Sequence, residues 1–302
     1  MRPALFLLAP AIALAQIGGP VMGLVPDGAE VRVMYGMPAA GSVGPAIASG
    51  LTKIAISPGQ NFAIGVNRDG AVVLALASGT TEPVTGVDAS PDSIAISPAG
   101  SAAALWFAAT SHFEILTGLP AAGNIRRVDA TAFGTPLAFA AGDDGHLAAS
   151  FAGGVEMFGV DGSVAPLAVE GRVLALTFLA NSTNLAMATA TRLMTVADGS
   201  PTTLYQAAAD AGRRLRASGV PAGIAVSIGN RWMVAAMRDG NVITADLAAG
   251  TASKSDCECI PDGVSFIAGA AFRLTGGLNS VKLIDASSGD FLDVPPAAGG
   301  AH

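Results

Sequence analysis

The stretch Ile54-Ala55-Ile56-Ser57-Pro58-Gly59-Gln60 decides how this chain folds, because its first half recurs along the sequence. Its first four residues alternate an apolar with a small side chain, as a short β-strand with two different faces does. Five further tetrads follow, the last a looser match: Ile94-Ala95-Ile96-Ser97, Leu137-Ala138-Phe139-Ala140, Leu174-Ala175-Leu176-Thr177, Ile224-Ala225-Val226-Ser227 and Val264-Ser265-Phe266-Ile267. Their second residues are 40, 43, 37, 50 and 40 residues apart, which indicates a structural repeat.

A turn glycine follows each tetrad at a nearly constant distance and provides a second marker of the repeat. The offsets from the second tetrad residue are 24, 28, 24, 24, 25 and 24, to Gly79, Gly123, Gly162, Gly199, Gly250 and Gly289. A seventh turn glycine, Gly41, follows a β-rich run at residues 31–35. Its tetrad would lie near Ile17, in a stretch that lacks the pattern. The sequence therefore predicts seven units, of which the first is incomplete or degenerate in its first strand.

Each unit reads as four short strands separated by turns. Ser57-Pro58-Gly59-Gln60 ends the first strand, because Pro presets φ and Gly permits positive φ. An Asp-Gly pair, as in Asp69-Gly70 and Asp239-Gly240, favours a tight hairpin between the second and third strands. The third strand ends at the turn glycine, and the fourth leads to the next tetrad. Four short strands in about 40 residues are typical of one β-propeller blade.

These tetrads, Ser-Pro-x-Gly turns and Asp-Gly hairpins resemble the repeat of seven-bladed β-propellers of the WD-repeat-like and bacterial surface-propeller group. The resemblance covers essentially the whole chain after residue 15 and implies an all-β fold with four-stranded antiparallel blades. The Trp-Asp dipeptide of WD repeats is absent, so the resemblance implies an architecture and no activity. We expect one domain over residues 16–302, with blades at about 17–50, 51–90, 91–132, 133–171, 172–220, 221–262 and 263–296.

Residues 1–15 have the pattern of a secretory signal peptide. Arg2 gives a positive start, residues 4–12 form an apolar run, and Ala13-Leu14-Ala15 suits a signal peptidase. We expect cleavage before Gln16 and an exported protein, periplasmic or secreted. The alternative is a buried N-terminal helix or strand. No later segment has 18 uninterrupted apolar residues, so we expect no transmembrane segment in the mature chain.

The composition excludes a disordered chain and argues against nucleic acid as a partner. Hydrophobic residues make up 51% of the 302 residues and charged residues 13%, whereas disordered chains are poor in the former and rich in the latter. Asp and Glu number 23 against 16 Lys and Arg, so the chain lacks the positive field that phosphate binding needs. We expect a monomer that binds no cofactor.

Cys257 and Cys259 are separated by one residue and leave the redox state open. Their spacing is too short for an ordinary loop-closing disulfide, but a local disulfide or two free thiols are both compatible with it. A structural zinc site needs four ligands. In addition to the two cysteines, the chain contains only three histidines, His112, His146 and His302. We therefore expect no metal site.

Candidate functional residues come from the loops that a propeller would bring to one face. His112 and Glu170 are weak candidates for the acid–base pair of a hydrolase at the channel mouth. The candidate binding residues are the loop arginines Arg68, Arg172, Arg213, Arg214, Arg216 and Arg238. The competing interpretation is that all of these are solvated loop residues, because no motif fixes their geometry.

Motifs for nucleophilic catalysis, phosphate binding and dinucleotide binding do not occur in a usable context. The sequence therefore favours a protein that is not an enzyme. The first hypothesis is an exported propeller that acts as a binding or scaffold module for a protein or an envelope component. A lactonase- or esterase-like hydrolase and a structural repeat in a surface assembly are the alternatives.

Overall fold

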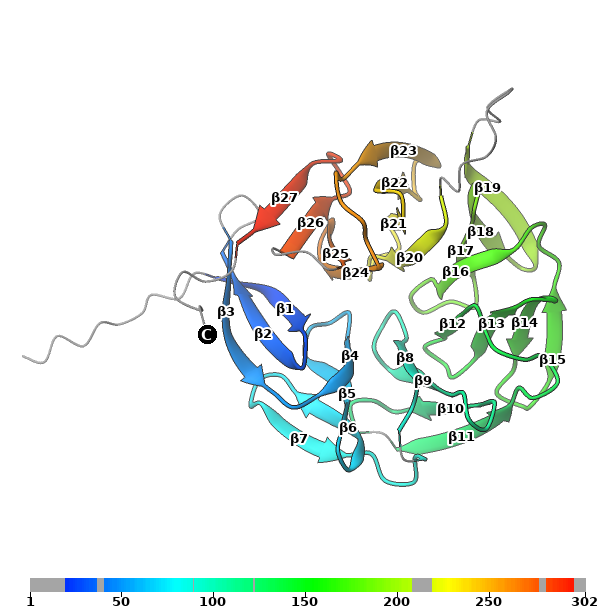
Figure 1. Ribbon diagram of the computed structural model, residues 1–302. Coiled ribbons are helices and arrows are strands. Elements are labelled where there is room, and N and C mark those ends of the chain that lie inside the picture. Colours follow the sequence, from blue (N-terminus) through cyan, green and yellow to red (C-terminus); the bar gives the residue numbers. More distant parts are fainter. Residues whose placement is uncertain are drawn as a thin grey trace, which may run out of the picture.

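Seven β-sheets form a ring in the computed structural model, which describes residues 20–36, 41–88, 90–121, 123–207, 219–276 and 281–295 (Figure 1). The sheets follow one another around the ring in chain order, as the colours of Figure 1 show. Six sheets have four antiparallel strands and the first has three. This architecture confirms the predicted seven-bladed β-propeller with an incomplete first blade. Among the described residues, no helix has the length and apolar composition needed to cross a membrane.

Blades 1 to 4 occupy the first half of the chain. Blade 1 contains β1 (Val21–Asp27), β2 (Glu30–Tyr35) and β3 (Ser42–Ala48). Blade 2 contains β4 (Thr52–Ile56), β5 (Phe62–Asn67), β6 (Gly70–Ala75) and β7 (Thr80–Pro83). Blade 3 contains β8 (Ser93–Ile96), β9 (Ala102–Phe107), β10 (His112–Thr117) and β11 (Asn124–Asp129). Blade 4 contains β12 (Ala138–Ala141), β13 (Leu147–Phe151), β14 (Gly154–Phe158) and β15 (Val164–Leu167).

Blades 5 to 7 complete the ring. Blade 5 contains β16 (Val173–Phe178), β17 (Leu185–Thr189), β18 (Arg192–Ala197) and β19 (Ser200–Gln206). Blade 6 contains β20 (Pro221–Val226), β21 (Trp232–Met237), β22 (Asn241–Asp246) and β23 (Thr251–Asp256). Blade 7 contains β24 (Gly263–Ala268), β25 (Ala271–Thr275), β26 (Val281–Asp285) and β27 (Phe291–Val294). In blades 2 to 7 the first strand lies nearest the axis and the fourth lies outermost (Figure 1).

Within the described residues, blade 1 has three strands, and β1 is the one that borders the ring axis. Its β1–β2 hairpin has a two-residue loop, like the β5–β6 hairpin of blade 2 and the β24–β25 hairpin of blade 7, and Leu24 and Pro26 of β1 line the channel. Side chains from both neighbouring blades bond to the open edge of β1. Leu24 N donates to Gln60 Oε1 at 2.7 Å, and Arg273 Nη2 donates to Pro26 O at 2.8 Å. These two contacts satisfy backbone groups of β1 on the edge that no strand pairs with among the described residues.

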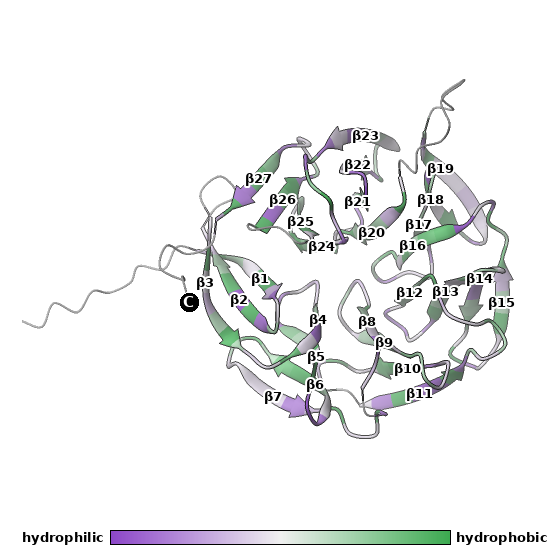
Figure 2. Cartoon of the chain, in the orientation of Figure 1, coloured by the Kyte–Doolittle hydropathy of each residue, from purple (hydrophilic) through white to green (hydrophobic). Residues whose placement is uncertain are grey.

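The hydrophobic core lies between neighbouring blades. Every residue of β9 and β13 is buried, because each middle strand is covered on both faces. Alternate residues of one strand therefore pack in two different clusters. Phe113 of β10 packs with residues of blade 4, while Leu116 of the same strand packs with residues of blade 2. Figure 2 accordingly shows hydrophobic colour on the middle strands, and paler or hydrophilic colour on the outer strands β7 and β19.

The serine at the end of three tetrads closes the first hairpin of its blade. Ser97 Oγ accepts a hydrogen bond from Ala102 N at 3.0 Å. Ser57 Oγ accepts from Phe62 N at 3.2 Å, and Ser227 Oγ accepts from Trp232 N at 3.0 Å. All three serines are buried, so each hydroxyl satisfies a backbone N–H that water reaches poorly. This shared contact is a physical reason for serine at the end of these tetrads.

We expect the Ser97→Ala substitution to lower the free energy of unfolding by about 1–2 kcal/mol, because it leaves a buried N–H without an acceptor. Chemical denaturation followed by circular dichroism measures the change. Ser93 is exposed at the start of β8 and provides the matched control. Its replacement by alanine should change the stability by less than about 0.5 kcal/mol. Equal losses in the two variants would contradict the hairpin-closing role.

Candidate functional site

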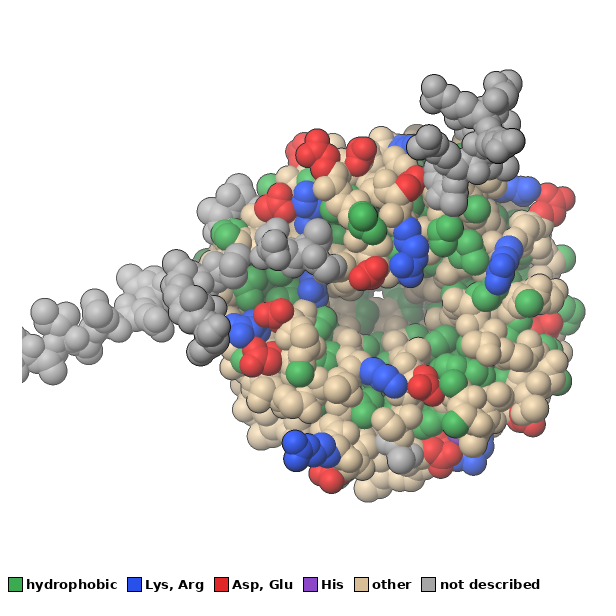
Figure 3. Space-filling model, viewed as in Figure 1, with side chains coloured by type: hydrophobic (Ala, Val, Ile, Leu, Met, Phe, Trp, Pro, Cys, Tyr) green, Lys and Arg blue, Asp and Glu red, His purple; other side chains and the backbone are tan. Residues whose placement is uncertain are grey.

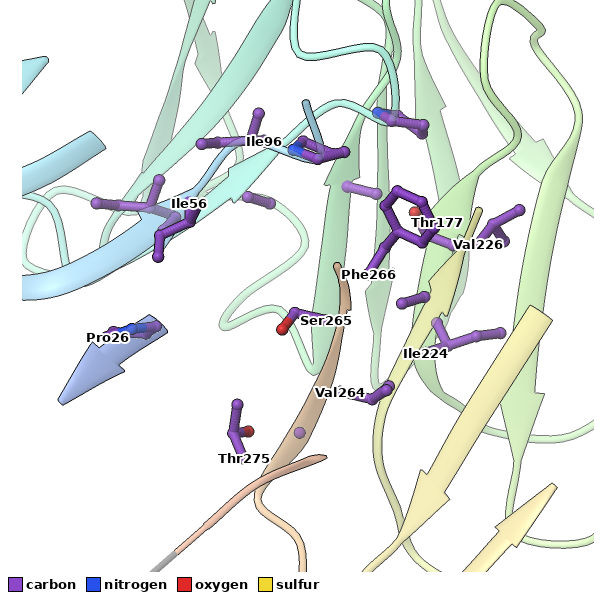
Figure 4. A pocket seen from close by; sticks show the side chains of 18 of the residues that line it. Pro26, Ile56, Ile96, Thr177, Ile224, Val226, Val264, Ser265, Phe266 and Thr275 are labelled. Atoms are coloured by element: carbon purple, nitrogen blue, oxygen red, sulfur yellow. The ribbon is translucent and has the colours of Figure 1, made fainter. Parts of the chain in front are cut away.

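A channel runs along the ring axis, surrounded by the tetrad strands and by β1. It encloses a cavity of about 470 Å³. Figure 4 shows Ile56, Ile96, Ile224 and Phe266 around this space, from β4, β8, β20 and β24. Among the described residues that line it, the polar side chains are those of Gln60, Thr177, Ser265 and Thr275, and none carries a carboxylate, an imidazole or a cation. The described lining of this cavity is therefore largely apolar and contains no acid–base pair.

A groove of about 700 Å³ opens beside this channel on the side of the first hairpin turns. We call it the first-hairpin groove; it is lined by Met22, Pro58, Gly59, Gln60, Ser227, Ile228, Gly229, Arg231, Trp232, Phe266, Ile267, Ala268 and Gly269. It shares Pro58, Gln60 and Phe266 with the channel lining, so the two spaces adjoin. Ile228 is 40% exposed in the turn after its tetrad. Blades 6 and 7 supply most of the groove.

Arg231 and Trp232 form the polar and aromatic edge of the first-hairpin groove. The guanidinium carbon of Arg231 lies 5.0 Å from the centre of the Trp232 ring, which is a cation–π distance. Arg231 Nη2 also lies 3.6 Å from Asp246 Oδ2. Elsewhere the surface carries scattered charges: Figure 3 shows a hollow at the centre of one face, with hydrophobic side chains around it and no large area of one charge.

His112 lies in β10, the third strand of blade 3, and not among the residues that line the channel. Its side chain is buried at the interface with blade 2, and its ring stacks on Phe107 with ring centres 4.8 Å apart. His112 Nδ1 lies 2.7 Å from Thr110 Oγ1. Its other nitrogen, Nε2, lies 3.4 Å from Asp88 Oδ2 and 3.5 Å from Glu114 Oε1. This histidine thus faces two carboxylates.

Arg127 completes the cluster from β11. Its Nη2 lies 2.6 Å from Asp88 Oδ2 and 2.8 Å from Glu114 Oε1. The hydrogen bonds to Glu114 and then to Asp88 raise the pKa of Arg127 above its usual value. The second oxygen of Glu114 accepts a hydrogen bond from Asp88 N at 3.1 Å. These contacts attach the connection after β7 to the third and fourth strands of blade 3.

Glu170 does not join this cluster. It precedes β16, in the connection between blades 4 and 5, and its Oε2 accepts a hydrogen bond from Arg192 Nη2 at 3.1 Å. The two catalytic candidates therefore have different partners in different parts of the ring. The sequence does contain a signal for one neighbour of His112. Side chains alternate between the two faces of a strand, so His112 and Glu114, two residues apart in β10, share a face. Glu114 is also directly opposite Arg127 in the strand register.

The described candidate arginines are dispersed over three blades. Arg68 is exposed in the β5–β6 hairpin loop, and Arg172 is exposed just before β16. Arg238 Nη1 lies 3.6 Å from Asp262 Oδ1. Arg213, Arg214 and Arg216 lie outside the described residues. The structure joins Cys257 and Cys259, the remaining candidate pair, in a disulfide.

Comparisons with known proteins support the fold and provide no family name. No protein-family model and no curated protein sequence matches the chain. The solved structure of streptogramin B lyase is similar at a TM-score of 0.60 and 13% identity, over 87% of this chain and 86% of that one. Sqt1 from Saccharomyces cerevisiae is similar at a TM-score of 0.56 and 11% identity, over 91% and 85%. Together with the ring of seven sheets, these likenesses identify the chain as a seven-bladed β-propeller.

Proposed function

We propose that the protein is a non-catalytic binding module that holds a segment of another protein in the first-hairpin groove. The observation that carries this proposal is the position of Trp232 and Arg231 beside an apolar groove. Tryptophan and arginine are the side chains that most often dominate protein–protein binding energy, especially within apolar surroundings. The neighbouring channel gives an apolar side chain of the partner further space to enter.

The channel lining favours binding over hydrolysis. A hydrolase needs positioned acid and base groups close to its substrate, and no described residue of the channel lining is titratable. The name of streptogramin B lyase denotes an enzyme. A shared fold at 13% sequence identity does not imply a shared activity, because proteins with unrelated functions have the same propeller architecture. A pocket that adjoins the channel contains one carboxylate among its described residues, that of Asp92, which lies 3.5 Å from Lys53 Nζ. The hydrolase alternative therefore lacks a supporting constellation among the described residues that line the cavity itself.

We further propose that the protein acts outside the cytoplasm. The disulfide between Cys257 and Cys259 supports this, since disulfides persist mainly in oxidising compartments. The leader pattern of residues 1–15, which lie outside the described residues, points the same way. Intact-mass measurement of the protein from its own cells tests the proposal. The expected chain begins at Gln16, and a mature chain that begins at Met1 contradicts it.

We expect Trp232→Ala and Ile228→Ser each to weaken partner binding, the tryptophan change by about 30-fold, which corresponds to the roughly 2 kcal/mol of a strong anchor residue. Partners are recovered from a native envelope extract by the immobilised protein, identified by mass spectrometry, and their affinities are measured with purified components. Val164→Ser is the matched control, because Val164 is also an exposed apolar residue but lies on the outer strand of blade 4.

Partner binding that survives both groove substitutions would contradict the proposed groove. A loss of binding in the Val164→Ser control would contradict it as well. Size-exclusion chromatography of the same proteins separates this result from the structural-repeat alternative. That alternative predicts concentration-dependent self-association of the wild-type chain, whereas a monomeric binding module elutes as one species at all concentrations.

A further inference from the structure

Asp88, His112 and Glu114 bring three potential metal-ligand atoms together between blades 2 and 3. One ligand atom from each residue lies within 4.8 Å of the others. The distances from His112 Nε2 are 3.4 Å to Asp88 Oδ2 and 3.5 Å to Glu114 Oε1. Ligands arranged tetrahedrally around zinc, with bonds of about 2.1 Å, lie about 3.4 Å from one another. The two distances from His112 Nε2 therefore match those within a small divalent ion's ligand shell.

The position of His112 provides a second, independent indication. Its Nε2 is buried and has no hydrogen-bond partner among the described residues, although a carboxylate oxygen lies 3.4 Å away on Asp88 and another lies 3.5 Å away on Glu114. The ring is held by the stack on Phe107 and by the contact of Nδ1 with Thr110 Oγ1. When Nδ1 carries the proton and donates to Thr110, Nε2 presents a lone pair to two negative groups. In that tautomer, the Nε2 lone pair and the two carboxylates together attract a metal ion, and a partner on Nδ1 is the usual outer contact of a metal-bound histidine.

Arg127 is a side-chain cation that competes for the same oxygens. Its Nη2 contacts Asp88 Oδ2 and Glu114 Oε1, the two atoms nearest to His112 Nε2. The Arg127 side chain is 56% exposed, so its guanidinium can leave the carboxylates without a large rearrangement of the core. Glu114 and His112 are buried in β10 and keep their positions. A bound ion and Arg127 are thus alternative partners of one pair of carboxylates.

We propose that Asp88, His112 and Glu114 form a binding site for a divalent first-row transition metal ion of the zinc type, for which Arg127 competes. One imidazole nitrogen and two carboxylate oxygens suit such ions, whereas calcium and magnesium favour oxygen ligands throughout. The ion ties the connection after β7 to β10 and so stabilises the contact between blades 2 and 3. This site is separate from the first-hairpin groove, and its test is independent of any protein partner.

The experiment is a titration of the full-length protein, freed of bound metal by a chelator, with Zn²⁺ in an isothermal calorimeter. We expect saturable binding of one equivalent and a rise in the unfolding temperature with Zn²⁺ concentration, because the ion binds the folded state. His112→Gln abolishes this binding. His146→Gln leaves it unchanged and is the matched control, since His146 pairs with Asp144 in another blade. Circular dichroism verifies that each variant folds.

Two further variants keep the proposal testable if the buried His112 cannot be replaced. Thr110→Val leaves all three ligands in place and is expected to weaken Zn²⁺ binding by about 10-fold, as loss of an outer partner does. Arg127→Met removes the competing cation, so it lowers stability without Zn²⁺ and tightens Zn²⁺ binding relative to the wild type. The alternative is a structural ion-pair cluster in which Arg127 is the only cation that pairs with Asp88 and Glu114. The proposal is overturned if neither the wild type nor Arg127→Met shows saturable binding, or if binding survives His112→Gln.

Discussion

Replacing Phe113 by alanine is expected to lower the free energy of unfolding by about 3–5 kcal/mol, the range measured for removal of a buried aromatic ring. Phe113 is fully buried in β10. Its ring centre lies 4.6 Å from that of Trp106 in the same blade and 5.1 Å from that of Phe139 in blade 4. The substitution therefore opens a cavity in the contact between two blades. Urea denaturation followed by circular dichroism measures the loss.

A control for the cavity effect is Val164→Ala, which removes an exposed apolar side chain from β15 of blade 4. Its expected effect is below about 0.5 kcal/mol. Phe113→Leu is a second control, because it leaves a smaller cavity and should cost less than the alanine variant. A loss of less than about 1 kcal/mol for Phe113→Ala would show that the interface between blades 3 and 4 relaxes around the cavity, contrary to the expectation.

Gly240→Ala is expected to destabilise the fold by about 2–4 kcal/mol, through two separate causes. Gly240 has a φ of 90°, in the left-handed region that residues with a Cβ seldom adopt. A Cβ at this position would also lie 2.7 Å from the carbonyl oxygen of Cys259, so this backbone must shift. The backbone there is constrained, because Cys257 N donates to Gly240 O at 2.9 Å and Cys257 is disulfide-bonded to Cys259.

Gly162→Ala separates the two causes. Gly162 has a φ of 87°, close to that of Gly240, but a Cβ there would meet no atom within 4 Å. We expect this variant to cost about 1 kcal/mol, from the backbone conformation alone. The difference between the two variants, measured in the same denaturation experiment, is the effect of the close approach to Cys259. Equal losses would mean that the backbone around Cys259 moves aside freely.

The ring of blades could be predicted because its signals are local. Apolar–small alternation specifies a strand with two faces, and the Pro, Gly and Asp-Gly turns specify where each strand ends. Each of these signals depends on residues a few positions apart, and the repeat multiplies them. The absence of a tetrad before Gly41 likewise predicts a blade that lacks its first strand, and the described part of blade 1 has three strands.

The candidate sites were harder to predict, because their residues come from different blades. The hypothesis that His112 and Glu170 form an acid–base pair depended on both residues lying in loops that meet at the channel mouth. The structure instead places His112 in a third strand, where the connection after β7 brings Asp88 to it. The first-hairpin groove was missed for the same reason. Trp232 and Phe266 line the groove but belong to different repeats. In the sequence, each looks like an ordinary aromatic core residue.

The sequence by itself determined the fold class, the number of blades and the incomplete first blade, since these follow from short-range alternation and turn chemistry repeated along the chain. Tertiary structure alone decided which side chains meet between blades. It directs Gln60 and Arg273 to the open edge of β1, where burial lowers the pKa of Arg273 to about 10. It also sets two carboxylates against His112. Such contacts depend on how neighbouring sheets twist and stack, and no periodic pattern within one repeat encodes that geometry.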